Sequence, residues 1–115
     1  MGELDARFFN KHDIAAAAVV AEEYRQHNPE VPDGQKPFVC LFAGFFKDNA
    51  QSKAEIVRSS ADGNLVWLHV HATNGTGDCG QAIVDIFRVR DGKLVEHWDV
   101  MQAVPRAAVN KNTMF

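Results

Sequence analysis

The sequence predicts an α+β fold, in which N-terminal helices pack against one face of a curved antiparallel sheet. Apolar residues recur at helical spacing up to about Asn49, whereas from Lys53 onward they alternate as they do in strands. Two Asp-Gly pairs, at 62–63 and 91–92, separate strand-like segments as hairpin turns would. Because the chain has 115 residues, we expect a single domain over residues 1–115.

Three helices are expected in the first half. A short one should run from Glu3 to Lys11, and a second from Ile14 to Arg25, where Asp13 can cap a run of four alanines. Pro29 ends that helix, because proline disfavours helical geometry at the residue before it. A third helix begins near Pro37 and carries an apolar stripe for packing against a sheet: Phe38, Leu41, Phe42, Phe45 and Phe46.

Four strands are expected in the second half. Their predicted ranges are 54–60, 65–72, 81–90 and 93–102, with a glycine-rich loop at 74–80. Residues 104–115 show no clear period. An antiparallel meander that follows helices is typical of α+β domains.

Composition excludes several classes of protein. Twelve Lys and Arg against 15 Asp and Glu give a net charge of −3, which argues against a nucleic-acid partner. Apolar runs fall short of the roughly 18 residues of a membrane span. The two cysteines, Cys40 and Cys79, lack paired-thiolate spacing and are expected to be reduced. We therefore expect a cytoplasmic protein with no membrane contact.

Polar residues interrupt the strands where a core is expected. The segment 65–72 alternates between two sets: Val66, Leu68 and Val70 on one face, and Trp67, His69 and His71 on the other. Asp85 interrupts an apolar run, and His97 and Asp99 share one face of the last strand. These residues are the candidates for chemistry.

The hairpin at 91–92 decides whether the carboxylates and histidines meet. A two-residue turn with regular pairing would place Asp85 opposite Trp98. A turn with Gly92 as a left-handed bulge would place Asp85 opposite His97 instead. We favour the bulge at Gly92, because it collects the titratable groups on one wall.

Such a wall would carry His69, His71, Asp85, His97 and Asp99, and three interpretations are open. It could be an exposed face or a satisfied polar network. It could bind a metal, since two histidines at alternate strand positions plus a carboxylate can ligate one ion. It could also line a pocket, where a carboxylate acts as a base and histidines orient the substrate.

Five segments of the sequence stand out together: YRQHNP at 24–29, VPDG at 31–34, VDIFR at 84–88, DGKLVEHWD at 91–99 and NTMF at 112–115. With these segments the chain resembles the SnoaL-like polyketide cyclase family, which has the nuclear transport factor 2-like fold. The resemblance extends from about Phe8 to Phe115. The family's first helix is usually longer, so the N-terminal helix looks shortened here.

The resemblance implies a cone-shaped fold with a pocket, a homodimer formed through the sheets, and catalysis without a cofactor. In the characterised cyclases, an aspartate at the position of Asp99 is thought to be the base of an intramolecular aldol condensation, and an asparagine falls at Asn28. A glutamine and a histidine of those enzymes are replaced by Ile83 and Asp85. The related ketosteroid isomerases need a tyrosine donor, but the only tyrosine, Tyr24, falls in the predicted helical half.

We therefore expect a small cofactor-free enzyme that acts on a carbonyl compound by general acid–base chemistry. Asp99 would be the base, His97 or His71 would move the proton, and Asp85 would orient an imidazole. No metal is assigned. The expected contacts with an apolar or ring-containing ligand are Asn28, His27, His69, Trp67, Ile83, Phe87 and Phe42.

Two further expectations concern assembly. A homodimer should form through an apolar sheet face made of Val66, Leu68, Val70, Val84, Ile86 and Trp98, because helices cannot cover both faces of one sheet. The alternative to an enzyme is a non-catalytic ligand-binding or dimerisation module with the same fold.

Overall fold

A computed structural model describes residues 5–115, with side chains from Phe8 onward. Two short helical turns come first, η1 (Asp5–Asn10) and η2 (Ile14–Val19). The remaining elements are β1 (Val20–Gln26), α2 (Gln35–Asp48), β2 (Ser52–Asp62), β3 (Leu65–Asn74), β4 (Gln81–Arg90) and β5 (Lys93–Ala103).

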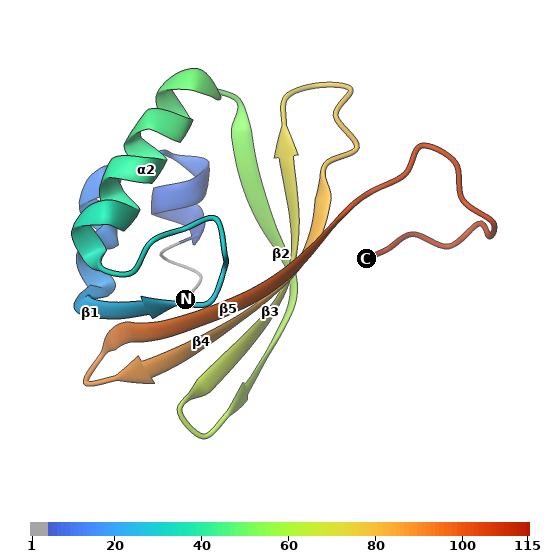
Figure 1. The fold of residues 1–115 in the computed structure, drawn as a ribbon. Helices are drawn as coiled ribbons and strands as arrows, with labels where there is room; N and C mark the ends of the chain where they lie inside the picture. The colour runs from blue at the N-terminus through green and yellow to red at the C-terminus, as the bar shows by residue number, and fades with distance from the viewer. Residues whose placement is uncertain (1–4) are drawn as a thin grey trace.

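The five strands form one twisted sheet in the order β1-β5-β4-β3-β2. Figure 1 shows α2 and the N-terminal turns together on one side of this sheet. The predicted α+β class and the antiparallel meander from β2 to β5 are confirmed. The structure adds β1, which pairs in parallel with β5 at the sheet edge.

The predicted helix over 14–25 is wrong in its second half. Asp13 does cap the start, since its Oδ1 accepts a hydrogen bond from the Ala15 amide at 3.1 Å. The helical turn then ends at Val19, and the chain continues as β1. The alanines at 15–18 stay in the helical turn, whereas residues 20–26 pair with β5, because a strand that extends a sheet and buries Tyr24 gains more than a further isolated turn of helix.

The predicted aromatic helix is confirmed as α2, and it closes the core. Phe38 and Phe46 are buried along its inner face. Phe8 from η1 is fully buried, and its ring centroid lies 5.2 Å from that of Phe38 and 5.1 Å from that of Phe46. The prediction of a helix from Glu3 to Lys11 is met by η1 within the described residues, while Glu3 lies outside them.

The hairpin between β4 and β5 differs from both registers considered above. Asp91 and Gly92 both have positive φ angles, 53° and 76°, and form a two-residue turn. The predicted bulge at Gly92 is therefore wrong. The pairing of β5 with β4 shifts by one residue beyond this turn: Leu94 pairs with Val89, but the next residue of β4, Arg88, pairs with Glu96 and not with Val95.

Val95 is consequently the extra residue of the hairpin. The extra residue shifts the rest of β5 by one position relative to β4, so that Asp85 lies opposite Asp99 and not opposite Trp98. His97 pairs with Phe87, two residues along from Asp85 on the same face. The polar groups of β4 and β5 meet as expected, but through a bulge at a different position.

The prediction that His69 and His71 share a face with Asp85 is wrong. Directly paired residues in an antiparallel sheet point to the same side, and Asp85 pairs with Leu68, whereas His69 pairs with Val84. Leu68 and Val70, predicted on the outer face, are instead buried in the core. The inner face therefore combines apolar β3 residues with the acids of β4 and β5, and the histidines of β3 point outward.

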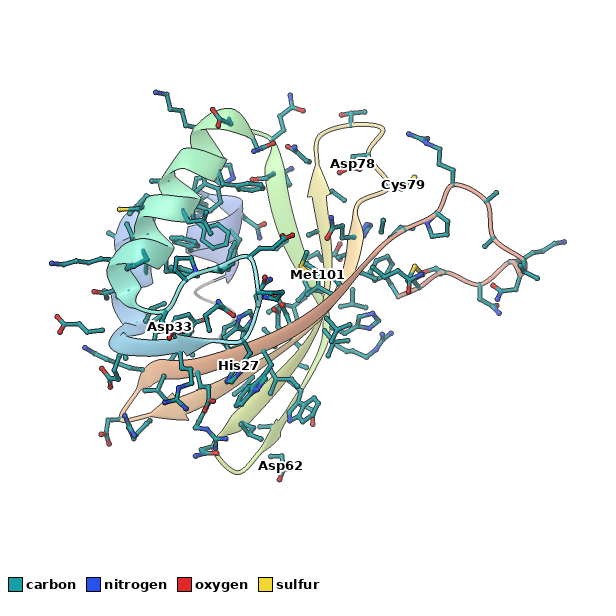
Figure 2. The ribbon with its side chains drawn as sticks, in the orientation of Figure 1. His27, Asp33, Asp62, Asp78, Cys79 and Met101 are labelled. Carbon is teal, nitrogen blue, oxygen red and sulfur yellow. The ribbon has the colours of Figure 1, made fainter. Side chains whose placement is uncertain are left out.

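The C-terminal segment returns to this outer face. The Phe115 ring stacks on His71 with centroids 4.1 Å apart, and on His69 at 5.5 Å. Figure 2 shows Cys79 in the loop before β4, on the side of the sheet where this segment runs. Cys40 and Cys79 are both free thiols, as predicted. Within the described residues, helices are too short and too polar to span a bilayer.

Candidate active site

Three side chains from β4 and β5 form the centre of the candidate site. His97 Nε2 lies 2.7 Å from Asp85 Oδ1 and 3.9 Å from Asp99 Oδ2. The side chain of Asp85 is 18% exposed, and those of His97 and Asp99 are 9% and 10% exposed. The two carboxylates lie directly opposite each other on neighbouring strands, and the imidazole lies next to both.

Asn28 connects the loop after β1 to this centre. Its Nδ2 donates a hydrogen bond to Asp99 Oδ2 at 3.1 Å. Its Oδ1 accepts the Glu30 backbone amide at 2.9 Å, in an Asx turn that fixes the amide's orientation. The oxygen of Asp99 nearest Asn28 is therefore a hydrogen-bond acceptor, and the structure brings these two sequence-predicted site residues together.

Gln26 and Tyr24 also belong to the site, and sequence reasoning missed both. Gln26 Oε1 lies 2.7 Å from His97 Nδ1. Tyr24 is 1% exposed, and its ring lies almost parallel to that of His97 with centroids 6.4 Å apart. Their spacing in the sequence contained the signal: residues 24, 26 and 28 alternate by two, so a strand places them on one face. The helical interpretation of this segment concealed it.

The environment of Tyr24 keeps its phenol neutral. Burial raises the pKa of Tyr24 far above its ordinary value, and the negative charges of Asp85 and Asp99 raise it further. A hydrogen bond with the Gln26 side chain acts in the opposite direction and is outweighed. The site therefore holds a buried hydroxyl that keeps its proton.

Apolar side chains adjoin the centre. The ring of Phe87 stacks on His97 with centroids 4.6 Å apart, as expected for a site residue. Ile83 packs against the core on the strand that carries Asp85. Phe42 packs among the core phenylalanines, with its ring centroid 4.8 Å from that of Phe38.

Four of the residues predicted to contact ligand or move a proton lie on the other face of the sheet. His71 and His69 point outward. The Nε2 atom of His71 lies 2.9 Å from the Cys79 carbonyl oxygen. Trp67 is 41% exposed on that face. His27 (labelled in Figure 2) stacks on Trp98 and lies 2.7 Å from Glu96 Oε2. Asp85 points to the inner face, so side chains on the outer face cannot contact it. The prediction that these four residues belong to this site is therefore wrong.

The residues that could hold a metal also differ from the expected set. The His69 and His71 pair is separated from the acids by the sheet. Asp85, His97 and Asp99 each offer one ligand atom, and these atoms lie within 4.8 Å of one another. One histidine and two carboxylates are a donor set that suits first-row divalent ions. Asp85 and His97 also lie within hydrogen-bond distance of each other, and Asp99 accepts a hydrogen bond from Asn28.

The arrangement suits proton transfer. One carboxylate, Asp99, accepts a hydrogen bond from a neutral amide at Oδ2, and its Oδ1 has no hydrogen-bond partner among the described residues. The other, Asp85, shares a hydrogen with an imidazole. A base and an imidazole that can hold the abstracted proton are the components of general acid–base catalysis.

Comparison with solved structures shows the same fold. A cystatin-fold protein from Novosphingobium aromaticivorans superposes with a TM-score of 0.75 at 18% identity, covering 86% of this chain and 92% of that one. IdmH from Streptomyces antibioticus, described as a candidate polyketide cyclase, gives 0.69 at 20% identity over 87% of both chains. A candidate polyketide cyclase from Bacillus cereus gives 0.70 at 22% identity, over 82% of this chain and 66% of that one.

These identities establish the fold alone. No curated protein sequence matches the chain. The SnoaL-like domain family, in contrast, matches residues 5–97, which include η1, the whole sheet up to His97, and Asp85. The predicted family and its nuclear transport factor 2-like fold are confirmed, and this chain belongs to the SnoaL-like family.

Proposed function

We propose that the protein is a cofactor-free enzyme that removes and returns a proton at carbon next to a carbonyl group, as in aldol condensation, isomerisation or dehydration. Asp99 is the base, and the pair formed by His97 and Asp85 receives or supplies the second proton. One observation carries the proposal: on one partly buried wall, the His97 imidazole lies 2.7 Å from the Asp85 carboxylate, and the Asp99 carboxylate lies 3.9 Å from the same ring nitrogen.

The surroundings of Asp99 favour the role of base for this acid over Asp85. Its Oδ2 accepts a hydrogen bond from the Asn28 amide, which holds the carboxylate in a fixed orientation. Asp85 is instead within 2.7 Å of His97 Nε2 and orients that ring. The buried, neutral Tyr24 hydroxyl adds a hydrogen-bond donor that can stabilise negative charge developing on a substrate oxygen.

Flat, largely apolar carbonyl compounds are the substrate class that this wall fits best. Phe87 and Ile83 provide apolar surface on the same strand as Asp85. Polar donors are few and fixed, so they suit one or two carbonyl oxygens. The two relatives described as candidate polyketide cyclases share the fold, and polyketides contain carbon between two carbonyl groups.

A homodimer through the outer sheet face is part of the same proposal, with a corrected set of residues. Trp67, Val84 and Val100 are 41%, 44% and 75% exposed on that face. Exposed apolar side chains on three neighbouring strands favour a protein interface. This set replaces Val66, Leu68 and Val70, which face the core.

The proposal is tested by a ligand screen followed by one substitution. Purified protein is screened for thermal stabilisation by cyclic 1,3-dicarbonyl and aromatic polyketide-like compounds, and turnover of each bound compound is followed by NMR. Asp99→Asn keeps the shape of the side chain and removes the proton acceptor. Asp62→Asn, at the distant turn between β2 and β3 (Figure 2), is the matched control.

We expect Asp99→Asn to fold and bind the compound while turnover falls roughly 100-fold or more, as loss of a general base costs. Asp62→Asn should behave as the wild type. Binding without turnover in the wild type would favour the non-catalytic module. A variant that melts much lower and loses binding would show instead that Asp99 only satisfies a buried polar network.

A further inference from the structure

Gln26 occupies a position in the site that determines where the hydrogens of His97 lie. It is the last residue of β1 and pairs with His97 in the parallel register with β5. The next residue is anchored as well, because the His27 amide donates to the His97 carbonyl at 2.9 Å. The backbone around Gln26 is thus fixed directly beside the imidazole.

The orientation of the Gln26 amide is determined by a backbone group. The Asn28 backbone N–H donates to Gln26 Oε1 at 3.0 Å. A backbone N–H can only donate, so the atom it meets must be the oxygen and not the amide nitrogen. The amide nitrogen is then free to interact with the Tyr24 phenol, in keeping with the lowering effect of the Gln26 side chain on the pKa of Tyr24.

The same oxygen determines the hydrogen position on His97. Gln26 Oε1 is 2.7 Å from His97 Nδ1. An amide oxygen can only accept, so Nδ1 must carry a hydrogen. The Nε2 atom, 2.7 Å from Asp85 Oδ1, is therefore the imidazole nitrogen that gains and loses a proton.

Without Gln26 the opposite arrangement would be expected. A neutral imidazole beside an ionised carboxylate places its single hydrogen on the nitrogen that faces the carboxylate. Here that nitrogen is Nε2, which would leave it unable to accept a proton. The Gln26 acceptor on the far side of the ring counteracts this preference.

We propose that Gln26 is a positioning residue that keeps a hydrogen on His97 Nδ1 and so reserves Nε2 for the exchangeable proton shared with Asp85. The consequence for turnover rests on the proposed function; the hydrogen position does not. Asp99 would take the proton abstracted from the substrate carbon, and the pair of Nε2 and Asp85 Oδ1 would receive or supply the second proton of the reaction.

The test is nitrogen NMR of protein labelled at the histidine rings, with His97 assigned by the signal that His97→Gln removes. In the wild type, we expect Nδ1 of His97 to have the chemical shift of a nitrogen that carries hydrogen, in both the charged and the neutral ring. Gln26→Leu removes the acceptor and should move the hydrogen of the neutral ring to Nε2. Gln26→Glu retains an acceptor and should retain the hydrogen on Nδ1.

Gln35→Leu is the matched control, because Gln35 is a second part-buried glutamine whose side chain, among the described residues, donates hydrogen bonds only to the backbone carbonyls of Ala17 and Val20. It should leave the His97 signals unchanged. Once a substrate is found, Gln26→Leu should lower kcat about 10- to 100-fold with little change in KM, within the contribution of a positioned acid or base. Gln26→Glu should recover part of that loss.

Two results would overturn the proposal. One is a wild-type His97 whose only ring hydrogen is on Nε2. The other is an unchanged nitrogen pattern in a folded Gln26→Leu protein. If the nitrogen shifts agree with the proposal while Asp99→Asn leaves turnover intact, the proposed function fails and the role of Gln26 in fixing the hydrogen stands.

Discussion

Raising the pH above 10 should destabilise the protein through a single residue, Tyr24. The buried phenol has a pKa raised far above its usual value, so the folded state retains a proton that the unfolded state loses. Below the ordinary pKa of about 10, both states are protonated and no effect arises. Above it, each pH unit removes about 1.4 kcal/mol of the free energy of unfolding.

The loss should reach roughly 3 kcal/mol at about pH 12, a large fraction of the 5–15 kcal/mol typical of a domain. Urea unfolding at several pH values, in the wild type and in Tyr24→Phe, isolates the contribution of the phenol from that of other groups that titrate there. Because Tyr24 is the only tyrosine, the absorbance of tyrosinate reports this residue alone. We expect tyrosinate to appear only as the protein unfolds.

The control is the slope of stability against pH, which should be smaller in Tyr24→Phe by the contribution of one proton. Tyrosinate that forms near pH 10 in a protein still folded by circular dichroism would refute the reasoning. So would identical slopes in the two proteins. Either result would mean that the hydroxyl reaches water and is not held neutral beside Asp85 and Asp99.

Three further predictions concern the core, an ion pair and the interface. Phe8→Ala should lower the free energy of unfolding by about 3–5 kcal/mol, measured by urea titration, because Phe8 is fully buried; a loss below 1 kcal/mol would contradict the packing. Hydrogen bonds from His27 first, and then Arg88, hold the pKa of Glu96 below its usual value, so the stability it contributes is present above about pH 4.5 and is lost as the pH falls. Glu96→Gln should accordingly lower the free energy of unfolding by less than about 1 kcal/mol at neutral pH, and should weaken the dependence of that free energy on pH below about 4.5. An unchanged dependence on pH in the variant would contradict this prediction. Val84→Glu should convert a dimer to a monomer in light scattering, whereas a dimer that survives this charge would place the interface elsewhere.

The sequence was sufficient for the meander because alternation of apolar residues and Asp-Gly turns are local signals. It was insufficient for β1, whose residues have helical spacing and become a strand only because β5 offers a partner. It was also insufficient for the position of the bulge. Val95 resembles any other strand residue, and nothing local to it shows that the pairing shifts there.

The faces of β3 could not be told apart for a related reason. Both faces of that strand carry apolar side chains, because Trp67 accompanies the two histidines, so alternation alone does not indicate which face meets α2 and the core. Pairing with β4 settles it, since Leu68 lies beside Asp85. The sequence thus placed the polar residues of β4 and β5 on one face as the structure does, misplaced those of β3, and missed Tyr24 and Gln26.

Deuterium exchange at carbon tests the central claim most directly, because it detects proton abstraction without requiring the natural reaction to be known. A cyclic 1,3-dicarbonyl compound that binds the protein is incubated in deuterium oxide, and loss of the proton between its carbonyl groups is followed by NMR. We expect the wild type to accelerate exchange, and Asp99→Asn to reduce the enzymatic rate roughly 100-fold or more while binding persists. Equal exchange by the wild type and a folded Asp99→Asn protein that still binds the compound would contradict the assignment of Asp99 as the base.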